Sequence, residues 1–277
     1  MMDSRIRAFL GKLAVVDGTA PLSDAKTVQL AHPERLVVIE EDDEVVALAV
    51  TARHLHDDAS HHWAIETALT PGLRFPAFED RLLETALGLA PSREAVSIWS
   101  HRHSLDAALQ RAGFAVAREL GRYVVELPLS QPIGGFDVRS FELPDTSDVL
   151  AINREAYAGH REASSLDEAE LRRLLGQEGL GSDGFLLADE ADTVVGFCWT
   201  RVHANGDGEI YRIAVAPKEQ GKGLGRSLVL AGFDFLSNRA DITSGTLWAD
   251  IADKRAVSLY ASIGMKLDFV NREFERP

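Results

Sequence analysis

Glu209 to Arg226 reads E-I-Y-R-I-A-V-A-P-K-E-Q-G-K-G-L-G-R, and this stretch decides the fold of the second half of the chain. Ile210 to Val215 is rich in β-branched and aromatic residues, which favours a strand, and Pro217 ends it. Apolar residues then recur from Leu224 to Phe235 at the spacing of one buried helical face. The stretch therefore predicts a strand, a glycine-rich loop and a helix in succession.

The glycine-rich loop has the composition of a phosphate-binding site. Gly221, Gly223 and Gly225 lack the Cβ atoms that would keep an anion away from the backbone. The free N–H groups at the start of the following helix attract an anion, and the helix dipole adds about half a positive charge. The loop matches neither G-x-x-x-x-G-K-[ST] nor G-x-G-x-x-G. A flexible glycine turn before an ordinary core helix is the alternative interpretation.

The segments after this helix extend the pattern. Thr246 to Ile251 is predicted to be a strand, and Asp253 to Ile263 a helix that ends at Gly264. With these elements, the spacing Gln220-x-x-Gly223-x-Gly225 resembles the Q/R-x-x-G-x-G/A loop of the GCN5-related N-acetyltransferases (GNAT). In that superfamily the loop binds the pyrophosphate of acetyl-CoA. The resemblance covers Phe185 to Phe274 and implies an α/β fold with a mixed sheet.

Composition excludes several classes of partner. The chain has 277 residues, which suits one or two domains, and its 43 acidic against 29 basic residues give a net charge of −14. Such a charge disfavours nucleic acid and anionic membranes as partners. The sequence has neither a long apolar run nor a secretory signal, so we expect a cytoplasmic protein. Cys198 is the only cysteine, and its apolar surroundings predict a core residue.

The chain contains an internal repeat. Arg35 to His54 aligns with Gly184 to His203, and Gly113 matches Gly264. Pro128 to Gly135 is the best candidate for the linker. We therefore expect two tandem GNAT domains, residues 1–130 and residues 131–277.

The two repeats differ where chemistry would matter. In place of Q-G-K-G-L-G-R, the first repeat has Gly72-Leu73-Arg74-Phe75-Pro76-Ala77-Phe78, which has a single glycine and cannot present the same amides. In the same alignment Trp63 lies opposite Glu209, and Leu109 opposite Tyr260. The first domain is therefore expected to be a degenerate partner that supports the structure and positions the substrate. A degenerate CoA site there is the alternative.

Histidines cluster in the first repeat. His54, His56, His61 and His62 surround two aspartates, a composition that can bind zinc. They fall in a predicted loop without the spacing of a catalytic metal site, so a solvated loop is favoured and no metal is expected.

Further stretches resemble one GNAT family, the mycothiol synthases. They are D-G-T-A-P-L-S-D (Asp17 to Asp24), I-N-R-E-A-Y-A-G-H-R-E (Ile152 to Glu162), and C-W-T-R-V-H followed by G-E-I-Y-R-I-A-V-A-P (Cys198 to Pro217). Together with the tandem layout, the match covers nearly the whole chain. The family acetylates the cysteinyl amine of cysteinyl-glucosaminyl-inositol, so the resemblance implies this small molecule as the partner. We expect a monomer.

The resemblance also implies the contacts of each substrate. Asp24, Glu162, Arg201, Glu209 and Trp248 would surround the pseudodisaccharide, although the family usually has Glu, Lys and Tyr at the positions of Asp24, Arg201 and Trp248. These changes alter the reach or the hydrogen bonding of the side chains. The residues implied to bind acetyl-CoA are Ile213, Ala214, Val215, Gln220, Gly221, Lys222, Gly223, Leu224, Gly225, Arg226, Asp253, Lys254, Arg255, Ala256, Val257 and Ser258.

Direct attack of an amine on a thioester needs no covalent enzyme intermediate. An α-amino group has a reference pKa of about 8, so a base must accept its proton, and Glu209 is the candidate, acting directly or through a water. Backbone N–H groups around Ile213 to Val215 would meet the acetyl carbonyl, and Tyr260 would protonate the departing thiolate. Glu209 as a surface strand residue and Tyr260 as core packing are the alternatives. At the level of function, the alternatives are an acetyltransferase for another amine and a non-catalytic acetyl-CoA sensor.

Overall fold

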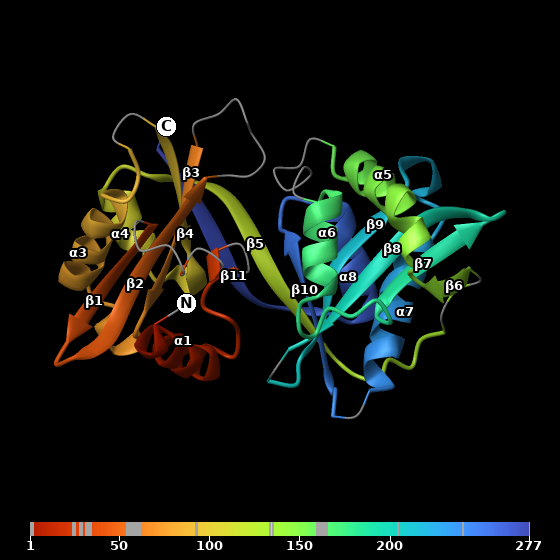
Figure 1. Ribbon diagram of the computed structural model, residues 1–277, viewed down its shortest axis with the longest axis horizontal. Coiled ribbons are helices and arrows are strands. Elements are labelled where there is room, and N and C mark those ends of the chain that lie inside the picture. Colours follow the sequence, from red (N-terminus) through yellow and green to blue (C-terminus); the bar gives the residue numbers. More distant parts are fainter. Residues whose placement is uncertain are drawn as a thin grey trace. The chain divides into compact units, whose positions relative to one another are not determined.

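The computed structural model describes residues 3–23, 26–27, 30, 35–53, 62–91, 94–132, 134, 136–158, 166–203, 205–239 and 241–276. The chain forms two compact units, Met1–Gly121 with Phe269–Pro277, and Arg122–Asp268 (Figure 1). The linker predicted at Pro128 to Gly135 falls inside the second unit. The strand β5 (Ala115–Glu126) carries the chain from the first unit into the second, and β11 (Lys266–Glu275) carries it back.

The first unit is a mixed sheet between helices. Its strands lie in the order β1-β2-β3-β4-β11-β5, with β3 and β4 parallel. The residues Phe78, Leu82 and Leu109 belong to the core that α3 and α4 form with one face of the sheet, and Phe9 of α1 packs in the core of the other face. The elements are α1 (Ser4–Asp17), β1 (Leu36–Glu41), β2 (Glu44–Arg53), β3 (His62–Leu69), η2 (Pro71–Leu73), α3 (Pro76–Leu87), β4 (Ala95–Ser100), η3 (His101–His103) and α4 (Asp106–Arg111).

The second unit has the same plan. Its strands lie in the order β5-β10-β9-β8-β7-β6, and β9 and β10 are parallel. Helices α7 and α8 pack with Phe233 in one core, while α5 and α6 pack on a second core that contains Phe185 stacked on Trp199. The elements are β6 (Asp137–Ser140), η4 (Leu143–Asp145), α5 (Thr146–Ala156), α6 (Glu168–Leu175), β7 (Phe185–Glu190), β8 (Thr193–Val202), β9 (Gly208–Val215), η5 (Pro217–Glu219), α7 (Leu224–Ser237), β10 (Ser244–Asp250) and α8 (Lys254–Ile263).

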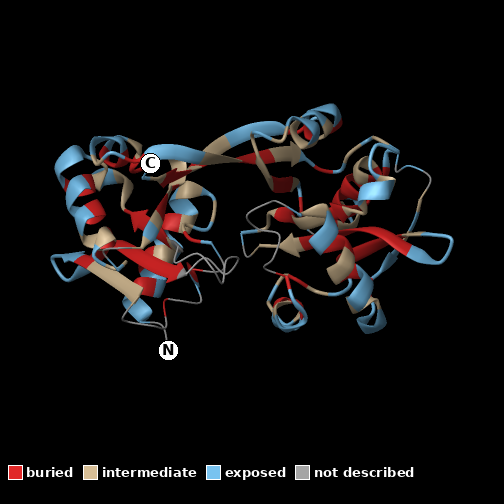
Figure 2. Ribbon diagram, turned by 90° about the horizontal axis from the view of Figure 1, so that it is seen from above, coloured by how far each residue is buried: buried red, intermediate tan, exposed pale blue. Residues whose placement is uncertain are grey.

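Burial follows the alternation of apolar residues that the sequence contains. Figure 2 shows buried residues concentrated on the strands and on the sheet-facing sides of the helices within each unit. Cys198 is fully buried, as predicted, and burial raises the pKa of its thiol. In the part of the chain that the structure describes, none of the helices is both long and apolar enough to span a bilayer.

Matching hydrogen bonds confirm the internal repeat. After α4, the N–H of Phe114 donates to the carbonyl of Leu109 at 2.9 Å, and after α8 the N–H of Met265 donates to that of Tyr260 at 3.1 Å. Both turns pass through a left-handed glycine, Gly113 with φ +82° and Gly264 with φ +101°. Leu109 and Tyr260 are thus equivalent positions, as the sequence alignment predicts.

The last strand was not predicted. Residues 272–275 of β11 lie antiparallel to β4 in the first unit, with Arg272 opposite Ser100 and Phe274 opposite Ile98. Phe274 is fully buried there. The end of the chain therefore completes the core of the unit in which the chain begins, a pairing that no local sequence pattern reveals.

Candidate active site

Two parallel strands separate at the centre of the second unit. β9 pairs with β10 only over three positions, Gly208 to Ile210 with Gly245 to Leu247, although β9 continues to Val215 and β10 to Asp250. After Ile210, β10 no longer pairs with the backbone of β9. Backbone N–H and C=O groups need partners, so this edge of β9 can bind an extended ligand between the strands.

The glycine-rich loop follows directly from β9. Gly221 and Gly223 have φ of +83° and +91°, a left-handed conformation that side chains disfavour, and a Cβ on either would meet no protein atom within 4 Å. Glycine is therefore needed for the backbone shape, and the space above the loop is open. Gly225 lies inside α7 with ordinary backbone angles, so the sequence argument for its role rests only on the close approach of a ligand.

The loop presents unpaired donors. Within the described residues, the backbone N–H groups from Gly221 to Arg226 donate to no protein acceptor, and the first bond of the helix runs from Ser227 to the carbonyl of Gly223 at 3.1 Å. Such a row of amides at a helix N-terminus binds phosphate oxygens. These amides suit the anion site that the sequence predicts here, and the site itself stays a prediction.

The two cations of the loop are engaged with neighbours. The Nζ atom of Lys222 lies 2.6 Å from a carboxylate oxygen of Glu219, and this bond raises the pKa of Lys222. The guanidinium of Arg226 donates to the side chain of Gln131. Both would have to exchange these partners in order to reach a phosphate. The backbone amides need no such exchange.

The predicted stretch Asp253 to Ser258 forms the start of α8. The carboxylate of Asp253 accepts hydrogen bonds from the N–H groups of Arg255 and Ala256, both at 3.0 Å, which is a standard N-cap. The Nζ atom of Lys254 donates to the carbonyl of Ile251 at 2.9 Å. Because Asp253 already satisfies these amides, this helix start is less available to an anion than that of α7.

Three of the residues predicted to bind the amine substrate share one face of the sheet. Arg201 lies directly opposite Glu209 in the antiparallel register of β8 and β9, so their side chains lie on the same face. Thr246 is the parallel partner of Glu209, and Trp248, two residues on, lies on the same face by alternation. Tyr211 lies there too, 5.7 Å below the guanidinium of Arg201. The sheet thus brings Arg201, Glu209 and Trp248 together.

Glu209 has a partner that the sequence analysis missed. Its side chain is 9% exposed, and its Oε2 atom lies 2.6 Å from Nε2 of His203. His203 is the last residue of the C-W-T-R-V-H motif and precedes the turn into β9. The signal that could have identified it is its position at the turn between the two strands that carry Arg201 and Glu209.

Tyr260 is buried beside two other tyrosines. Its ring packs against Tyr123 with centroids 6.0 Å apart. Burial raises the pKa of Tyr260 above its ordinary value, and the nearby Tyr157 and Asp253 raise it further. The phenol therefore stays protonated through the neutral and mildly alkaline range and can donate a proton.

Tyr157 contacts the separated part of β9. Its hydroxyl donates to the carbonyl oxygen of Ile213 at 2.7 Å, and Arg212 donates to the buried side chain of Asn153 at 3.0 Å. Both partners come from α5 and the residue that follows it. These contacts add to the pairing with β8 where β9 has separated from β10, and the sequence analysis predicted neither contact as part of the site.

Some predicted residues cannot be placed. Asp24 and Glu162 lie outside the described residues, as do His54, His56 and His61 and the side chain of His62. Among the residues that the structure does describe, no group of three or more His, Cys, Asp or Glu side chains is arranged to hold a metal ion.

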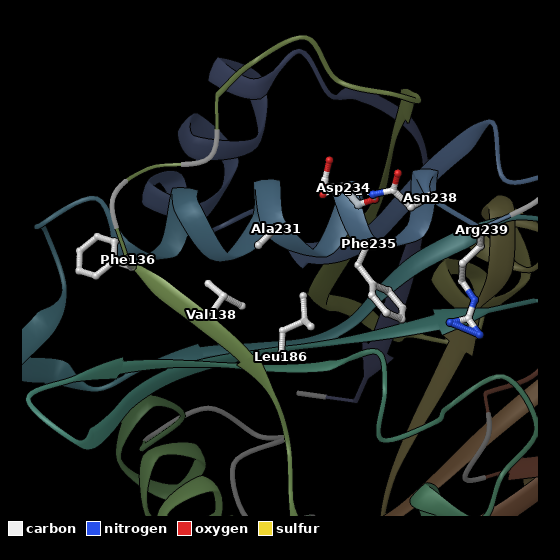
Figure 3. A pocket seen from close by; sticks show the side chains of 8 residues that line it. All are labelled: Phe136, Val138, Leu186, Ala231, Asp234, Phe235, Asn238 and Arg239. Atoms are coloured by element: carbon white, nitrogen blue, oxygen red, sulfur yellow. Dashed lines mark hydrogen bonds between the residues drawn. The ribbon is translucent and has the colours of Figure 1, made fainter.

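A separate groove lies between α7 and the strands β6 and β7. It has a volume of about 410 Å³, and Figure 3 shows Phe136, Val138 and Leu186 along it, with Asn238 and Arg239 at one end. Arg239 is paired with Asp183 at 2.8 Å. None of the predicted site residues lines this groove, so it is not part of the candidate active site.

Comparisons with known proteins match the chain to one family. Residues 147–265 match the model of the acetyltransferase (GNAT) family. The chain is 35% identical to a mycothiol acetyltransferase of Renibacterium salmoninarum over 92% of this chain and 82% of that protein. It is 32% identical to one of Thermobispora bispora over 94% of this chain and 90% of that protein.

Solved structures share the fold along the whole chain. A GCN5-related N-acetyltransferase from Sphaerobacter thermophilus superposes with a TM-score of 0.70 at 19% identity, covering 100% of this chain and 98% of that one. A tandem GNAT protein from the clavulanic acid biosynthesis pathway gives 0.67 at 15% identity, covering 99% and 94%. The tandem architecture predicted from the internal repeat is thus found in a solved structure.

Proposed function

Since the chain belongs to the mycothiol acetyltransferase family of GNAT proteins, we propose that it transfers the acetyl group of acetyl-CoA to the cysteinyl amine of cysteinyl-glucosaminyl-inositol. The family makes the chain an acyltransferase, so a purely non-catalytic sensor is set aside. The observation that carries the choice of acceptor is the shared face of Arg201, Glu209 and Trp248 beside the separation of β9 and β10.

Acetyl-CoA would bind along the separated strand and the loop. The unpaired amides from Gly221 to Arg226 suit its pyrophosphate, and the edge of β9 that has separated from β10 suits the extended pantetheine arm. Gln220 is close to both, since its side chain donates to the carbonyl of Val215 at 3.2 Å. With acetyl-CoA bound in this way, we expect its thioester to lie between Glu209 and Tyr260.

The chemistry needs a base, an oxyanion donor and an acid. Glu209 removes a proton from the substrate ammonium, and the free amine attacks the thioester carbon. Backbone N–H groups between Ile213 and Val215 stabilise the developing oxyanion. Tyr260 donates its proton to the departing sulfur and recovers one from the attacking nitrogen, while Arg201 orients the acceptor by hydrogen bonding.

The first unit would support the second without binding acetyl-CoA. In its loop the N–H of Leu73 donates to Thr70 at 2.9 Å, that of Arg74 to Pro71 at 3.3 Å and that of Phe75 to Leu73 at 2.9 Å. These amides are already used within the chain. The first helical residue of α3 is Pro76, which has no N–H. Isothermal titration with acetyl-CoA should therefore give one site per chain, and two sites would contradict this assignment.

The experiment that tests the proposed function compares acceptors. Purified protein is assayed with acetyl-CoA and cysteinyl-glucosaminyl-inositol, and its kcat/KM is compared with those for free cysteine, a peptide with a free N-terminus and an aminoglycoside. We expect a preference of roughly 10³-fold or more for the pseudodisaccharide, because several polar contacts must be satisfied together. A higher kcat/KM for any other amine would contradict the proposed acceptor.

A further inference from the structure

His203 is held by the turn between β8 and β9. Its N–H donates to the carbonyl of Asp207 and its own carbonyl accepts from the N–H of Gly206, both at 2.9 Å. Gly206 adopts a left-handed φ of +87° that this tight turn requires. The backbone thus directs the imidazole toward Glu209, with Nε2 2.6 Å from Oε2.

Glu209 is buried, whereas its partner His203 is partly exposed to solvent. The side chain of Glu209 is 9% exposed and that of His203 is 30% exposed. Within the described part of the chain, the second carboxylate oxygen of Glu209 accepts no hydrogen bond. One oxygen is therefore available to a substrate, while the other is bonded to a group that reaches solvent.

The proposed reaction releases one proton. An ammonium and a thioester give an amide, a thiol and H⁺, so one proton must leave the site in every turnover. Two protons leave the nitrogen. One replaces the proton that Tyr260 gives to the sulfur, and the other, taken from the ammonium before attack, remains on the buried Glu209. The carboxylate must lose this proton before it can act again.

We propose that His203 is a positioning residue that orients Glu209 and carries its proton to solvent. The inference rests on the proposed role of Glu209 as the base. Rotation of the carboxyl group brings the proton that Glu209 receives from the substrate to Oε2, and Oε2–H gives it to Nε2 of the neutral imidazole, which regenerates the carboxylate and makes an imidazolium. The Nδ1–H of that imidazolium then passes a proton to water, and proton exchange with water returns the imidazole to the tautomer that can accept at Nε2. Histidine suits this step because its reference pKa, about 6.5, lies near neutral pH.

The charged groups near His203 and Glu209 have other partners or lie on a neighbouring strand. Asp207, in the same turn, is bound at 2.8 Å by Arg122, which also binds Asp268 at 2.7 Å. Arg201 lies across the strand register from Glu209. In the described residues, Glu209 is the only carboxylate bonded to His203.

The test separates the relay from a structural role. The His203→Gln side chain can still donate a hydrogen bond to Glu209 but cannot accept and release a proton. The assay follows release of the CoA thiol with an amine that the wild-type protein acetylates, whichever amine that is. We expect KM values within about 3-fold of wild type and a kcat at least roughly 10-fold lower.

Chemical rescue provides the second readout. His203→Ala should be slow, and free imidazole in the buffer should restore part of its kcat in proportion to concentration, whereas Glu209→Gln should not respond. Wild-type kcat in His203→Gln, or a folded His203→Ala that imidazole does not rescue, would overturn the proposal. If Glu209→Gln itself has wild-type kcat, the proposed base is wrong and the relay with it. An inactive Glu209→Gln beside a fully active His203→Gln removes the relay alone.

Discussion

Arg201 on β8 and Glu209 on β9 occupy directly opposite positions in the strand register, with their side chains on the same face of the sheet. The residues lie eight positions apart in the sequence around a tight turn, so the strand pairing itself places a cation beside the proposed base. The guanidinium lies 5.7 Å from the ring centroid of Tyr211 on the same face.

The first prediction concerns this cation. Arg201→Lys should keep most of the activity, since lysine is the residue usual in the family at this position and it retains the charge. Arg201→Met should raise the KM for the amine substrate by about 10-fold while the KM for acetyl-CoA changes little, because a charge-assisted hydrogen bond contributes roughly 1.5–3 kcal/mol. Steady-state kinetics with each substrate varied in turn measures both. An equal rise in the two KM values would argue against a specific acceptor contact.

A second prediction concerns the proposed acid. Tyr260→Phe keeps the buried ring and should lower kcat by about 10²-fold, since only the proton donor is removed. Tyr123→Phe is the matched control, because Tyr123 packs against Tyr260 but has no proposed role, and it should retain kcat.

Ionisation of Tyr260 should also make the stability of the protein depend on pH. Its pKa is raised in the folded protein, so the unfolded chain loses this proton first as the pH rises. The contribution to the free energy of unfolding should fall only above about pH 10, the reference value for tyrosine. Chemical denaturation of wild type and Tyr260→Phe across that range should show a weaker alkaline loss in the variant. An alkaline loss of the same size in both proteins would contradict the raised pKa.

The third prediction concerns the loop. Gly223→Ala puts a Cβ on a residue with φ of +91°, which should cost about 1 kcal/mol of stability and displace amides of the anion site. The KM for acetyl-CoA should rise by at least about 10-fold with little change in the KM for the amine. Gly11→Ala, in the interior of α1 with no atom within 4 Å, is the control, and should leave both KM values unchanged while stabilising the helix slightly. An unchanged KM for acetyl-CoA in Gly223→Ala would remove the loop from the binding site.

The glycine loop and α8 could be predicted because their signals are local. The closely spaced glycines of the loop and the glycine that ends α8, Gly264, can be recognised in the sequence alone. His203 and Glu209, by contrast, meet only after β8 and β9 pair around their turn, and Phe274 finds its partners on β4 far along the chain. Sequence patterns describe which face a residue occupies, but contacts between elements depend on register. The contacts of Asp24 and Glu162 remain predictions.

A fourth prediction concerns Glu66, buried in the first unit. Burial opposes its ionisation, but the contacts from His101, Lys26 and Ser23 outweigh this and lower its pKa to about 2. The N–H and hydroxyl of Ser23 donate to its two oxygens at 2.7 and 2.5 Å. Glu66 thereby anchors the segment that leads directly into Asp24.

The sign of the pH effect follows from this lowered pKa. The carboxylate stabilises the fold above its unfolded value, 4.5, and this stabilisation is lost as the pH falls toward about 2. Its size is about 3 kcal/mol by the linkage relation. Glu66→Gln should lose that stability at pH 7 and show a flatter acid limb in denaturant titrations. Glu84→Gln, exposed on α3, is the control, and an unchanged acid limb in Glu66→Gln would refute the role.

The most direct test of the central claim is to follow both products of one reaction. Wild-type protein is mixed with acetyl-CoA and cysteinyl-glucosaminyl-inositol, and the CoA thiol and the N-acetylated pseudodisaccharide are quantified together by mass spectrometry, alongside Glu209→Gln. The account predicts equal amounts of the two products, with a rate at least about 10²-fold lower in the variant. Release of CoA without N-acetylation of the cysteinyl amine, or a Glu209→Gln variant as fast as wild type, would contradict it.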